Sequence, residues 1–257
     1  MGKWDPDSYL KFEDERTQPS YDLVSRIDIA RPASIIDIGC GPGNSTMVLR
    51  RRWPHSRIIG LDSSPEMIAR AKETYPRENW LIADASEWEC AERFDVVFSN
   101  ATLQWIPNHE SLIRKLWNRV NDGNGALAVQ VPANTDSPLY QAVSTVSRRN
   151  EWKEALSGCG ELFTYHDPEF YYDLLSADSK RVYVWRTTYF HVMANHQGLI
   201  DWYASTGMRP YLERLADVQR HSFREHVLEE IRDRFSRRQD GKILFPFRRL
   251  FFIAYRE

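Results

Sequence analysis

The chain has 257 residues and a formal net charge of −2, and 27% of its residues are charged. This length can bury one large α/β core with insertions, and the near balance of charge argues against strong non-specific binding to nucleic acid. The three cysteines include no C-x-x-C pair, so the sequence shows neither a disulfide framework nor a zinc signature, and we expect no metal.

No segment of the sequence predicts a membrane anchor. The N-terminal residues lack an apolar signal core, and no run of eighteen or more apolar residues occurs. Together with the cysteine usage, this pattern leads us to expect a cytoplasmic protein with no membrane and no nucleic-acid partner. The sequence indicates no particular oligomeric state.

Basic residues are concentrated in the last quarter of the chain. Residues 181–257 carry 14 basic and 9 acidic side chains, and most of the basic ones are arginine. Because the arginine fork suits carboxylates and phosphates, this quarter is a candidate for binding an anion. The alternative is a set of solvated helix faces, which would account for many of these arginines.

The first predicted elements are two short helices, one within residues 5–17 and one over 19–27. A short apolar run over 35–38 follows and ends in three alternating glycines. Beyond them a helical pattern runs to an arginine cluster at 50–52, where cations stabilise the negative end of a helix dipole. Strand, tight turn and helix together are typical of the first turn of a Rossmann-like βαβ unit.

The glycines, Gly39, Gly41 and Gly43, indicate that a ligand approaches this turn. Glycine avoids Cβ clashes and tolerates positive φ, and the N-terminus of the next helix presents free N–H groups. A dinucleotide site usually has the spacing G-x-G-x-x-G, whereas here Asp37 precedes more closely spaced glycines. A nucleotide-like ligand is therefore expected at this turn. The alternative is a tight connection that binds nothing.

The next three predicted strands end in polar side chains. These strands cover residues 57–62, 80–85 and 94–101. Ligands of open α/β sheets bind beyond the carboxyl ends of the strands, so Asp62, Asp84 and Asn100 are expected around one crevice. Asp62 is the strongest single prediction, because a carboxylate at the tip of the second strand can accept both ribose hydroxyls. Asp84 is expected to accept an adenine amino group beside the Ala85 backbone, with Met67 near the adenine face.

The rest of the chain continues the α/β alternation. A helix and a fifth strand come first, then a helical insertion, a long β-rich run, three helices and a last strand. The helix is expected over 110–120 and the fifth strand over 126–131. The helical insertion covers 132–179 and the β-rich run 181–193. The three helices cover 196–206, 208–215 and 217–235, and the last strand covers 243–255.

The D-I-G-C-G-P-G motif at 37–43, followed by Asp62, resembles the first motifs of the class I S-adenosylmethionine (SAM) methyltransferases. The resemblance implies a Rossmann-like α/β fold with a mostly parallel seven-stranded sheet, helices on both faces and a helical substrate cap. A single methyltransferase domain would then span 1–257. Its parts would be N-terminal lid helices at 1–30, a SAM-binding core at 31–131, helical cap insertions at 132–179 and 195–238, and C-terminal strands at 181–193 and 243–256.

The cofactor implied by this resemblance is SAM, with S-adenosylhomocysteine as its product. The N-terminal segment would fold over the cofactor, although its apolar side chains would equally well pack on the sheet. The expected cofactor contacts are Tyr9, Arg16, Asp37, Gly39, Cys40, Gly41, Gly43, Asn44, Asp62, Ser63, Met67, Asp84, Ala85 and Asn100.

Segments farther along the chain carry a more specific resemblance. W-R-T-T-Y at 185–189, T-G-M-R-P at 206–210 and R-L-F at 249–251 are similar to the trans-aconitate 2-methyltransferase family, whose pattern is weak here between 134 and 167. The resemblance implies methyl transfer from SAM to a carboxylate of trans-aconitate or a related polycarboxylate, giving a monomethyl ester.

The residue chemistry agrees with such a reaction. A carboxylate is already ionised at neutral pH, so no general base is needed, and we predict catalysis by orientation with no acid–base catalytic residue. A small anionic carboxylate needs cations, and arginine forks are well suited to it. The expected substrate contacts are Trp105, Arg186, Tyr189, His191, Trp202, Arg209 and Arg249. The structural alternatives are a core position for Trp202, a satisfied core histidine at 191 and an acid partner for Arg186.

Two other functions remain open from the sequence. One is another small-molecule methyltransferase acting on a malonyl thioester or a quinone-type acceptor, for which His191 would be the nearest candidate base. The other is a SAM-binding module without turnover. Detection of a methylated product distinguishes an enzyme from a binding module.

Overall fold

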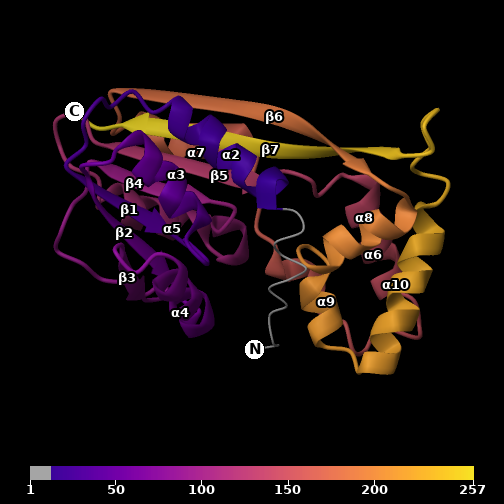
Figure 1. Cartoon of the computed structure of the whole chain (residues 1–257). Helices are drawn as coiled ribbons and strands as arrows, with labels where there is room; N and C mark the ends of the chain where they lie inside the picture. The colour runs from indigo at the N-terminus through magenta and orange to yellow at the C-terminus, as the bar shows by residue number, and fades with distance from the viewer. Residues whose placement is uncertain (1–12) are drawn as a thin grey trace. The chain divides into compact units, whose positions relative to one another are not determined.

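The computed structural model describes residues 13–257, and the chain divides into two compact units (Figure 1). The first unit, here called the sheet unit, comprises residues 16–132, 164–187 and 250–257. The described part of the second, here called the helical unit, comprises residues 13–15, 133–163 and 188–249.

The described strands form a seven-stranded sheet in the order β3-β2-β1-β4-β5-β7-β6. The first five positions are mutually parallel, and β7 is antiparallel to its neighbours, since Ala133 N–H donates to the Arg248 carbonyl and Lys180 N–H to that of Tyr255. A mostly parallel sheet is therefore confirmed, with an antiparallel edge. The strands are β1 Ser34–Ile38, β2 Arg57–Asp62, β3 Asn79–Ile82, β4 Val96–Asn100, β5 Ala126–Pro132, β6 Arg181–Met193 and β7 Ile243–Tyr255.

Burial explains why the central strands form where they do. Ile35, Ile36 and Ile38 of β1 are fully buried, and every residue of β5 is buried. Parallel strands covered on both faces have such continuous apolar runs instead of an alternating pattern. The predicted bounds of β6 and β7 agree with the structure.

Short helices connect the strands of the sheet unit. The helix after β2 begins with Ser64, whose side chain accepts a hydrogen bond from Met67 N–H, and Pro65 occupies the first helical turn. These elements are α2 Glu13–Ser25, α3 Asn44–Arg52, α4 Pro65–Thr74, η1 Leu103–Trp105, α5 His109–Trp117 and α7 Pro168–Ser176.

Several predicted ends differ from the structure by a few residues, for example α10, which ends at Ile231 and not at 235. Two of the differences have a clear physical reason. The two N-terminal helices were expected to break at Pro19, but α2 continues through it, with Leu23 and Val24 of its later turns buried in the core. The third strand was expected to reach residue 85, but β3 ends at Ile82 because its partner β2 ends opposite it at Asp62. An edge strand cannot continue once the neighbouring ladder stops.

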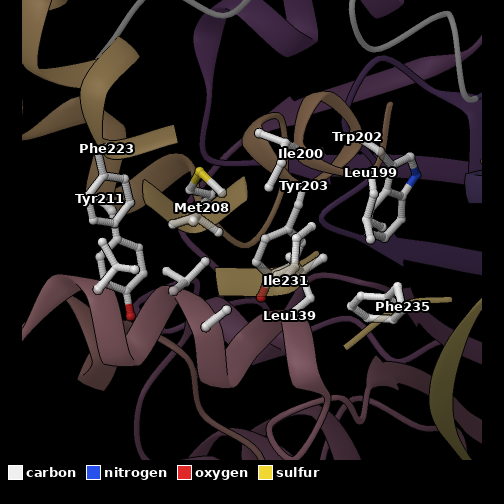
Figure 2. Close-up of a cluster of buried hydrophobic side chains, with 14 of the residues drawn as sticks. Leu139, Leu199, Ile200, Trp202, Tyr203, Met208, Tyr211, Phe223, Ile231 and Phe235 are labelled. Carbon is white, nitrogen blue, oxygen red and sulfur yellow. The ribbon is translucent and has the colours of Figure 1, made fainter. Parts of the chain in front are cut away.

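The helical unit is built around one buried apolar cluster (Figure 2). The three helices predicted after β6 are present, and aromatic rings such as Phe223, Tyr211 and Trp202 lie between them. Among the described residues, no helix combines the length and apolar character needed to cross a membrane. The helices are α6 Pro138–Ser147, η2 Cys159–Leu162, α8 His196–Ala204, α9 Arg209–Glu213 and α10 Asp217–Ile231.

Phe223 is a test of how much this cluster stabilises the fold. Its side chain is fully buried on α10, with its ring centroid 5.5 Å from that of Trp152. Phe223→Ala should lower the free energy of unfolding by about 3–5 kcal/mol, because a cavity replaces a buried ring. Val218→Ala, a change at an 86% exposed position of the same helix, should change it by less than about 0.5 kcal/mol. Urea denaturation of both variants measures the difference, and equal stabilities would contradict the packing described here.

Candidate functional site

The glycine turn after β1 is held in a conformation that side chains disfavour. Gly39, Gly41 and Gly43 have φ angles of 71°, 55° and 101°. A Cβ atom on Gly39 would lie 2.1 Å from the Thr102 side chain, whereas one on Gly41 would meet nothing within 4 Å. The first glycine is therefore required by packing, and the second leaves open space above the turn that a ligand can enter.

Asp62 links this turn to the tip of β2. Its carboxylate accepts one hydrogen bond from Gly41 N–H and one from Ser64 N–H, both at 2.9 Å. Burial raises the pKa of this carboxyl group, and the two backbone donors oppose that effect. Each carboxylate oxygen has further lone-pair capacity, so the group remains able to accept ligand hydroxyls.

Asp37 lies beneath the turn and is fully buried. One of its oxygens accepts hydrogen bonds from Ser45 Oγ at 2.6 Å and Thr46 Oγ1 at 2.7 Å, and its Oδ1 has no hydrogen-bond partner among the described residues. Burial raises its pKa to about 6. The structure thus shows Asp37 fixing the first turn of α3, while its direct contact with a cofactor stays a prediction.

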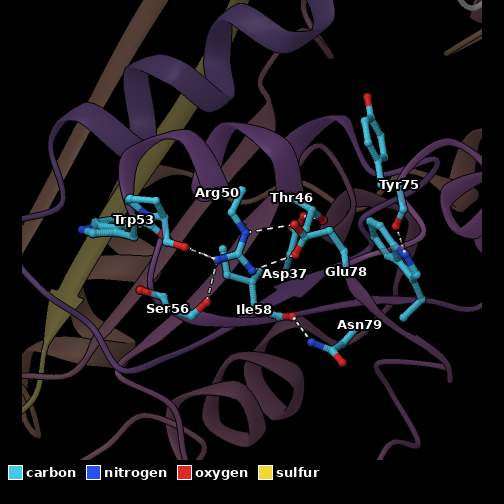
Figure 3. A network of polar contacts seen from close by, with 11 residues as sticks. Asp37, Thr46, Arg50, Trp53, Ser56, Ile58, Tyr75, Glu78 and Asn79 are labelled. Atoms are coloured by element: carbon cyan, nitrogen blue, oxygen red, sulfur yellow. Dashed lines mark hydrogen bonds and ion pairs between the residues drawn. The ribbon is translucent and has the colours of Figure 1, made fainter.

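The far end of α3 is held by a second polar network (Figure 3). Arg50 forms a two-pronged ion pair with Glu78, with distances of 2.9 and 2.8 Å, and donates to the carbonyls of Pro54 and Ser56. This is the structural role expected for a cation at a helix C-terminus. The glycine turn is therefore followed by a helix that is anchored at both ends.

Asn100 and Asp84 have different environments from each other. Asn100 ends β4, and its Oδ1 is buried without a hydrogen-bond partner among the described residues. Asp84 lies beyond the end of β3, exposed, where it accepts hydrogen bonds from the Ser86 hydroxyl and backbone N–H, which hold its pKa below the usual range. The expectation that Asp84 ends a strand is wrong, for the reason given for β3.

The other predicted cofactor residues differ in burial. Cys40 is buried, and its thiol lies 3.6 Å from the Gly41 carbonyl. Met67 is half-buried in the first turn of α4, next to the exposed Ser63, and Ala85 is buried. Asn44 begins α3. Tyr9 lies outside the described residues, as does the side chain of Arg16.

A buried histidine that the sequence analysis did not single out holds the loop after Asn100. His109 is 1% exposed; its Nε2 lies 2.8 Å from the Leu103 carbonyl and must donate to it, so its Nδ1 accepts from the Tyr171 hydroxyl at 2.7 Å. Burial lowers the pKa of His109, which keeps the ring neutral. The contact joins residues 62 positions apart, so no sequence spacing indicates it.

Two of the candidate arginines are half-exposed or exposed and have protein partners. Arg186 donates to the Tyr165 hydroxyl at 2.9 Å and pairs with Asp167 at 3.3 Å, as the structural alternative for this residue expected. Arg209 pairs with Glu213, one turn along α9, at 2.6 Å. Ion pairs this exposed contribute little to stability and can be exchanged for a ligand.

The third candidate arginine, Arg249, lies in the helical unit and is buried. Arg249 is 4% exposed, and its guanidinium lies 4.8 Å from the Phe247 ring centroid. The buried rings of His191 and Trp202 both contact the Phe247 ring, and the ring centroids of His191 and Trp202 are 5.6 Å apart. Burial and the Arg249 charge lower the pKa of His191 to about 4. Trp202 does belong to the core, as its alternative expected, and Tyr189 is half-buried on β6.

Comparison with known proteins places this geometry in a family. A model described as a methyltransferase domain matches residues 35–123. The trans-aconitate 2-methyltransferase of Azoarcus sp. (strain BH72) is 38% identical over 256 residues, covering 100% of both chains, and that of Yersinia pestis (strain Pestoides F) is 39% identical, covering 99% of each. The chain belongs to the trans-aconitate 2-methyltransferase family.

Solved structures share the fold of this family member. The YcgJ protein from Bacillus subtilis has a TM-score of 0.59 at 14% identity, over 93% of this chain and 99% of its own. Phosphoethanolamine N-methyltransferase 2 of Haemonchus contortus, bound to S-adenosylhomocysteine, has a TM-score of 0.58 at 16% identity, over 97% of this chain and 57% of its own. These likenesses show the fold. The full-length relatives and the matching methyltransferase domain show that the protein is a SAM-dependent methyltransferase, and its cofactor is SAM.

The residues around the glycine turn fit that cofactor. SAM carries an ammonium group, ribose hydroxyls and a sulfonium centre, all of which interact favourably with acceptors and negative charge. The unpartnered Asn100 Oδ1, the Asp62 carboxylate and the open space at Gly41 supply acceptors and room. A dinucleotide pyrophosphate would instead meet two aspartates, Asp37 and Asp62.

The raised pKa of Asp37 predicts how stability depends on pH. Its ordinary value is 3.8 and its folded value about 6, so the native state holds this proton more tightly than the unfolded state. The contribution of this proton to the free energy of unfolding is complete below pH 4. It is lost as the pH rises through 6, which lowers the free energy of unfolding by about 3 kcal/mol. Asp37→Asn should remove this contribution, whereas Asp173→Asn, at an exposed position of α7, should not. Denaturant titrations of cofactor-free protein between pH 4 and 7 measure it, and parallel pH profiles for Asp37→Asn and the wild type would refute it.

The hydrogen bond from Tyr171 to His109 can be tested with adjacent tyrosines. Tyr171→Phe leaves His109 Nδ1 buried without a donor, which should lower the free energy of unfolding by about 1–3 kcal/mol. Tyr172→Phe, at the neighbouring 50% exposed position, should change it by less than about 0.5 kcal/mol. Urea denaturation and the KM for SAM are measured together. Equal stability of the two variants would show that this bond does not hold the loop.

Proposed function

We propose that the protein transfers the methyl group of SAM to a carboxylate of trans-aconitate, giving a monomethyl ester and S-adenosylhomocysteine. The observation that carries the proposal is the full-length agreement with relatives of that name, at 38–39% identity. The methyltransferase-domain model covers residues 35–123 alone, within the sheet unit. The agreement therefore extends to the helical unit, where a substrate would be selected.

The reaction proceeds without acid–base catalysis. A carboxylate oxygen attacks the methyl carbon, the C–O bond forms as the C–S bond breaks, and the electron pair goes to sulfur. The products are an uncharged ester group, on an acid whose other carboxylates stay ionised, and an uncharged thioether sulfur. Because the carboxylate is ionised at neutral pH, no proton must be removed. The protein's task is to hold oxygen, carbon and sulfur in line at a reactive separation of roughly 3–3.5 Å. Consistently, His191 is buried and neutral, and needs no role as a base.

The sheet unit is proposed to bind the methyl donor. Asp62 accepts the ribose hydroxyls, Asn100 accepts the ammonium group, and the turn at Gly41 lies against the amino-acid portion of the cofactor. Met67 and the segment around Asp84 and Ala85 bind the adenine. Asp37, Gly39, Cys40, Gly43, Asn44 and Ser63 stay predicted contacts of the cofactor, as the sequence analysis has them.

The helical unit is proposed to bind the acid, as the substrate-binding cap expected from the sequence. Its cationic and aromatic candidates are Arg209 and Arg249, with His191 and Trp202. Arg186 and Trp105 lie in the sheet unit, and their contact with the substrate stays a prediction from the sequence. A small carboxylate is the substrate class that these cations favour.

An acceptor screen tests the function. Purified protein is incubated with methyl-labelled SAM and a panel of di- and tricarboxylates, a malonyl thioester and a quinone precursor, and base-labile methyl ester is measured. We expect ester with trans-aconitate. Label in a base-stable product from another acceptor would favour a different methyltransferase, and SAM binding without any product would favour a binding module.

A substitution of Asp62 tests the proposed cofactor site. Asp62→Ala should weaken SAM binding roughly 10- to 100-fold, because hydrogen bonds to a charged acceptor contribute about 1.5–3 kcal/mol. Asp84→Ala should have a smaller effect, since this carboxylate is exposed and its Oδ1 is occupied by Ser86. Calorimetric titration with S-adenosylhomocysteine measures both. Unchanged affinity in Asp62→Ala would exclude this carboxylate from the site.

A further inference from the structure

Three nitrogen-bearing side chains of the helical unit meet around one aromatic ring. His191 on β6, Trp202 on α8 and Arg249 on β7 all contact Phe247, at 5.9, 4.9 and 4.8 Å from its centroid. Phe245 closes another side, 5.4 Å from Trp202. A cation and two polar rings are thus enclosed by apolar surface, where electrostatic interactions are stronger than in water.

Two buried nitrogens in this cluster have no protein partner. His191 Nε2 and Trp202 Nε1 are without hydrogen bonds among the described residues, although the side chains are 6% and 1% exposed. An unsatisfied buried polar group costs about 1–3 kcal/mol, so native proteins retain few of them without a reason. The indole N–H can only donate, so whatever satisfies it must be an acceptor. His191 is neutral and can donate one N–H as well.

An unpartnered indole alone would not indicate a ligand, and the same unit shows why. Trp152 Nε1 is also buried and has no hydrogen-bond partner within residues 13–257, but its ring contacts are Phe223 and His226, at 5.5 and 6.0 Å. Trp202 differs because it shares its aromatic contact with the buried guanidinium of Arg249. A cation beside two neutral donors is a donor set that matches an anion.

We propose that His191, Trp202 and Arg249 bind one carboxylate of the acid substrate, and that this carboxylate is the one left unmethylated. The two unpartnered ring nitrogens and the adjacent guanidinium together supply N–H donors for the two oxygens of a single carboxylate. Donors that occupy its lone pairs make such an oxygen a poor nucleophile. The methylated carboxylate must then be a second one on the same molecule.

This inference rests on the proposed function and restricts its substrate class. An acid acceptor needs at least two carboxylates, one to be anchored and one to receive the methyl group. A monocarboxylic acid with a similar carbon skeleton, such as crotonate, would lack the anchor. We therefore expect its kcat/KM to be at least about 100-fold below that of trans-aconitate, which corresponds to the loss of one charged, hydrogen-bonded contact.

The experiment compares variants that remove one donor at a time. Trp202→Phe and His191→Leu should each raise the KM for trans-aconitate about tenfold or more, with a smaller change in kcat and an unchanged Kd for S-adenosylhomocysteine. His191→Gln keeps an N–H donor and should recover part of the loss. The matched control is Trp152→Phe, which removes an equally buried indole N–H and should leave KM unchanged. Circular dichroism and thermal unfolding check the fold of each variant.

The outcomes separate this inference from the function on which it rests. If the wild type esterifies no acid in the panel, the proposed function is wrong. If it esterifies trans-aconitate but KM is the same in His191→Leu and the wild type, or crotonate reacts as well as trans-aconitate, the anchoring role is wrong. Should Trp202→Phe fail to fold, the comparison of His191→Leu with His191→Gln decides, because a merely structural histidine would not show recovery of KM.

Discussion

The hydrogen bond from Gly41 N–H to the Asp62 carboxylate is the constraint on which the cofactor region depends. It joins the turn after β1 to the tip of β2, and the same carboxylate accepts the Ser64 N–H at the start of α4. One side chain therefore fixes a turn, a strand end and a helix start. Because both partners are backbone groups, the geometry does not depend on flexible side chains. The carboxylate that we propose as the ribose acceptor is therefore held in place before any ligand arrives, and this preorganisation would reduce the entropic cost of binding.

Buried polar atoms at the two candidate regions differ in kind. At the end of β4 in the sheet unit, Asn100 Oδ1 is a buried acceptor with no hydrogen-bond partner among the described residues, and Asp62 ends the strand β2. In the helical unit the buried polar atoms include the nitrogens of His191 and Trp202, next to the buried cation Arg249. Acceptors and acids suit a cationic methyl donor, and donors with a cation suit an anionic acid. Methyl transfer from a sulfonium to a carboxylate joins ligands of these two kinds, and no metal or base is needed to account for either.

Local patterns in the sequence were sufficient for most of the elements and for the identity of the cofactor turn. The bounds of β6 and β7 agree with those expected, and the spacing of the glycines after Asp37 indicated the turn that the φ angles show. Such features depend on the periodicity of apolar residues and on backbone geometry within a few positions. The expected end of the third strand was wrong because a strand at the edge ends where its partner does, and Pro19 did not break α2 because packing of the later turns outweighed a local preference.

What the sequence determined by itself was the order of elements, the Rossmann-like sheet and the residue types around a SAM site. It could not tell which arginine is buried: Arg186, Arg209 and Arg249 looked equivalent, and only Arg249 is enclosed among aromatic rings. Nor could it find the contact between His109 and Tyr171, 62 positions apart. Only the tertiary structure decided these points, because burial and the pairing of polar atoms depend on which distant segments pack together, and no local pattern records that.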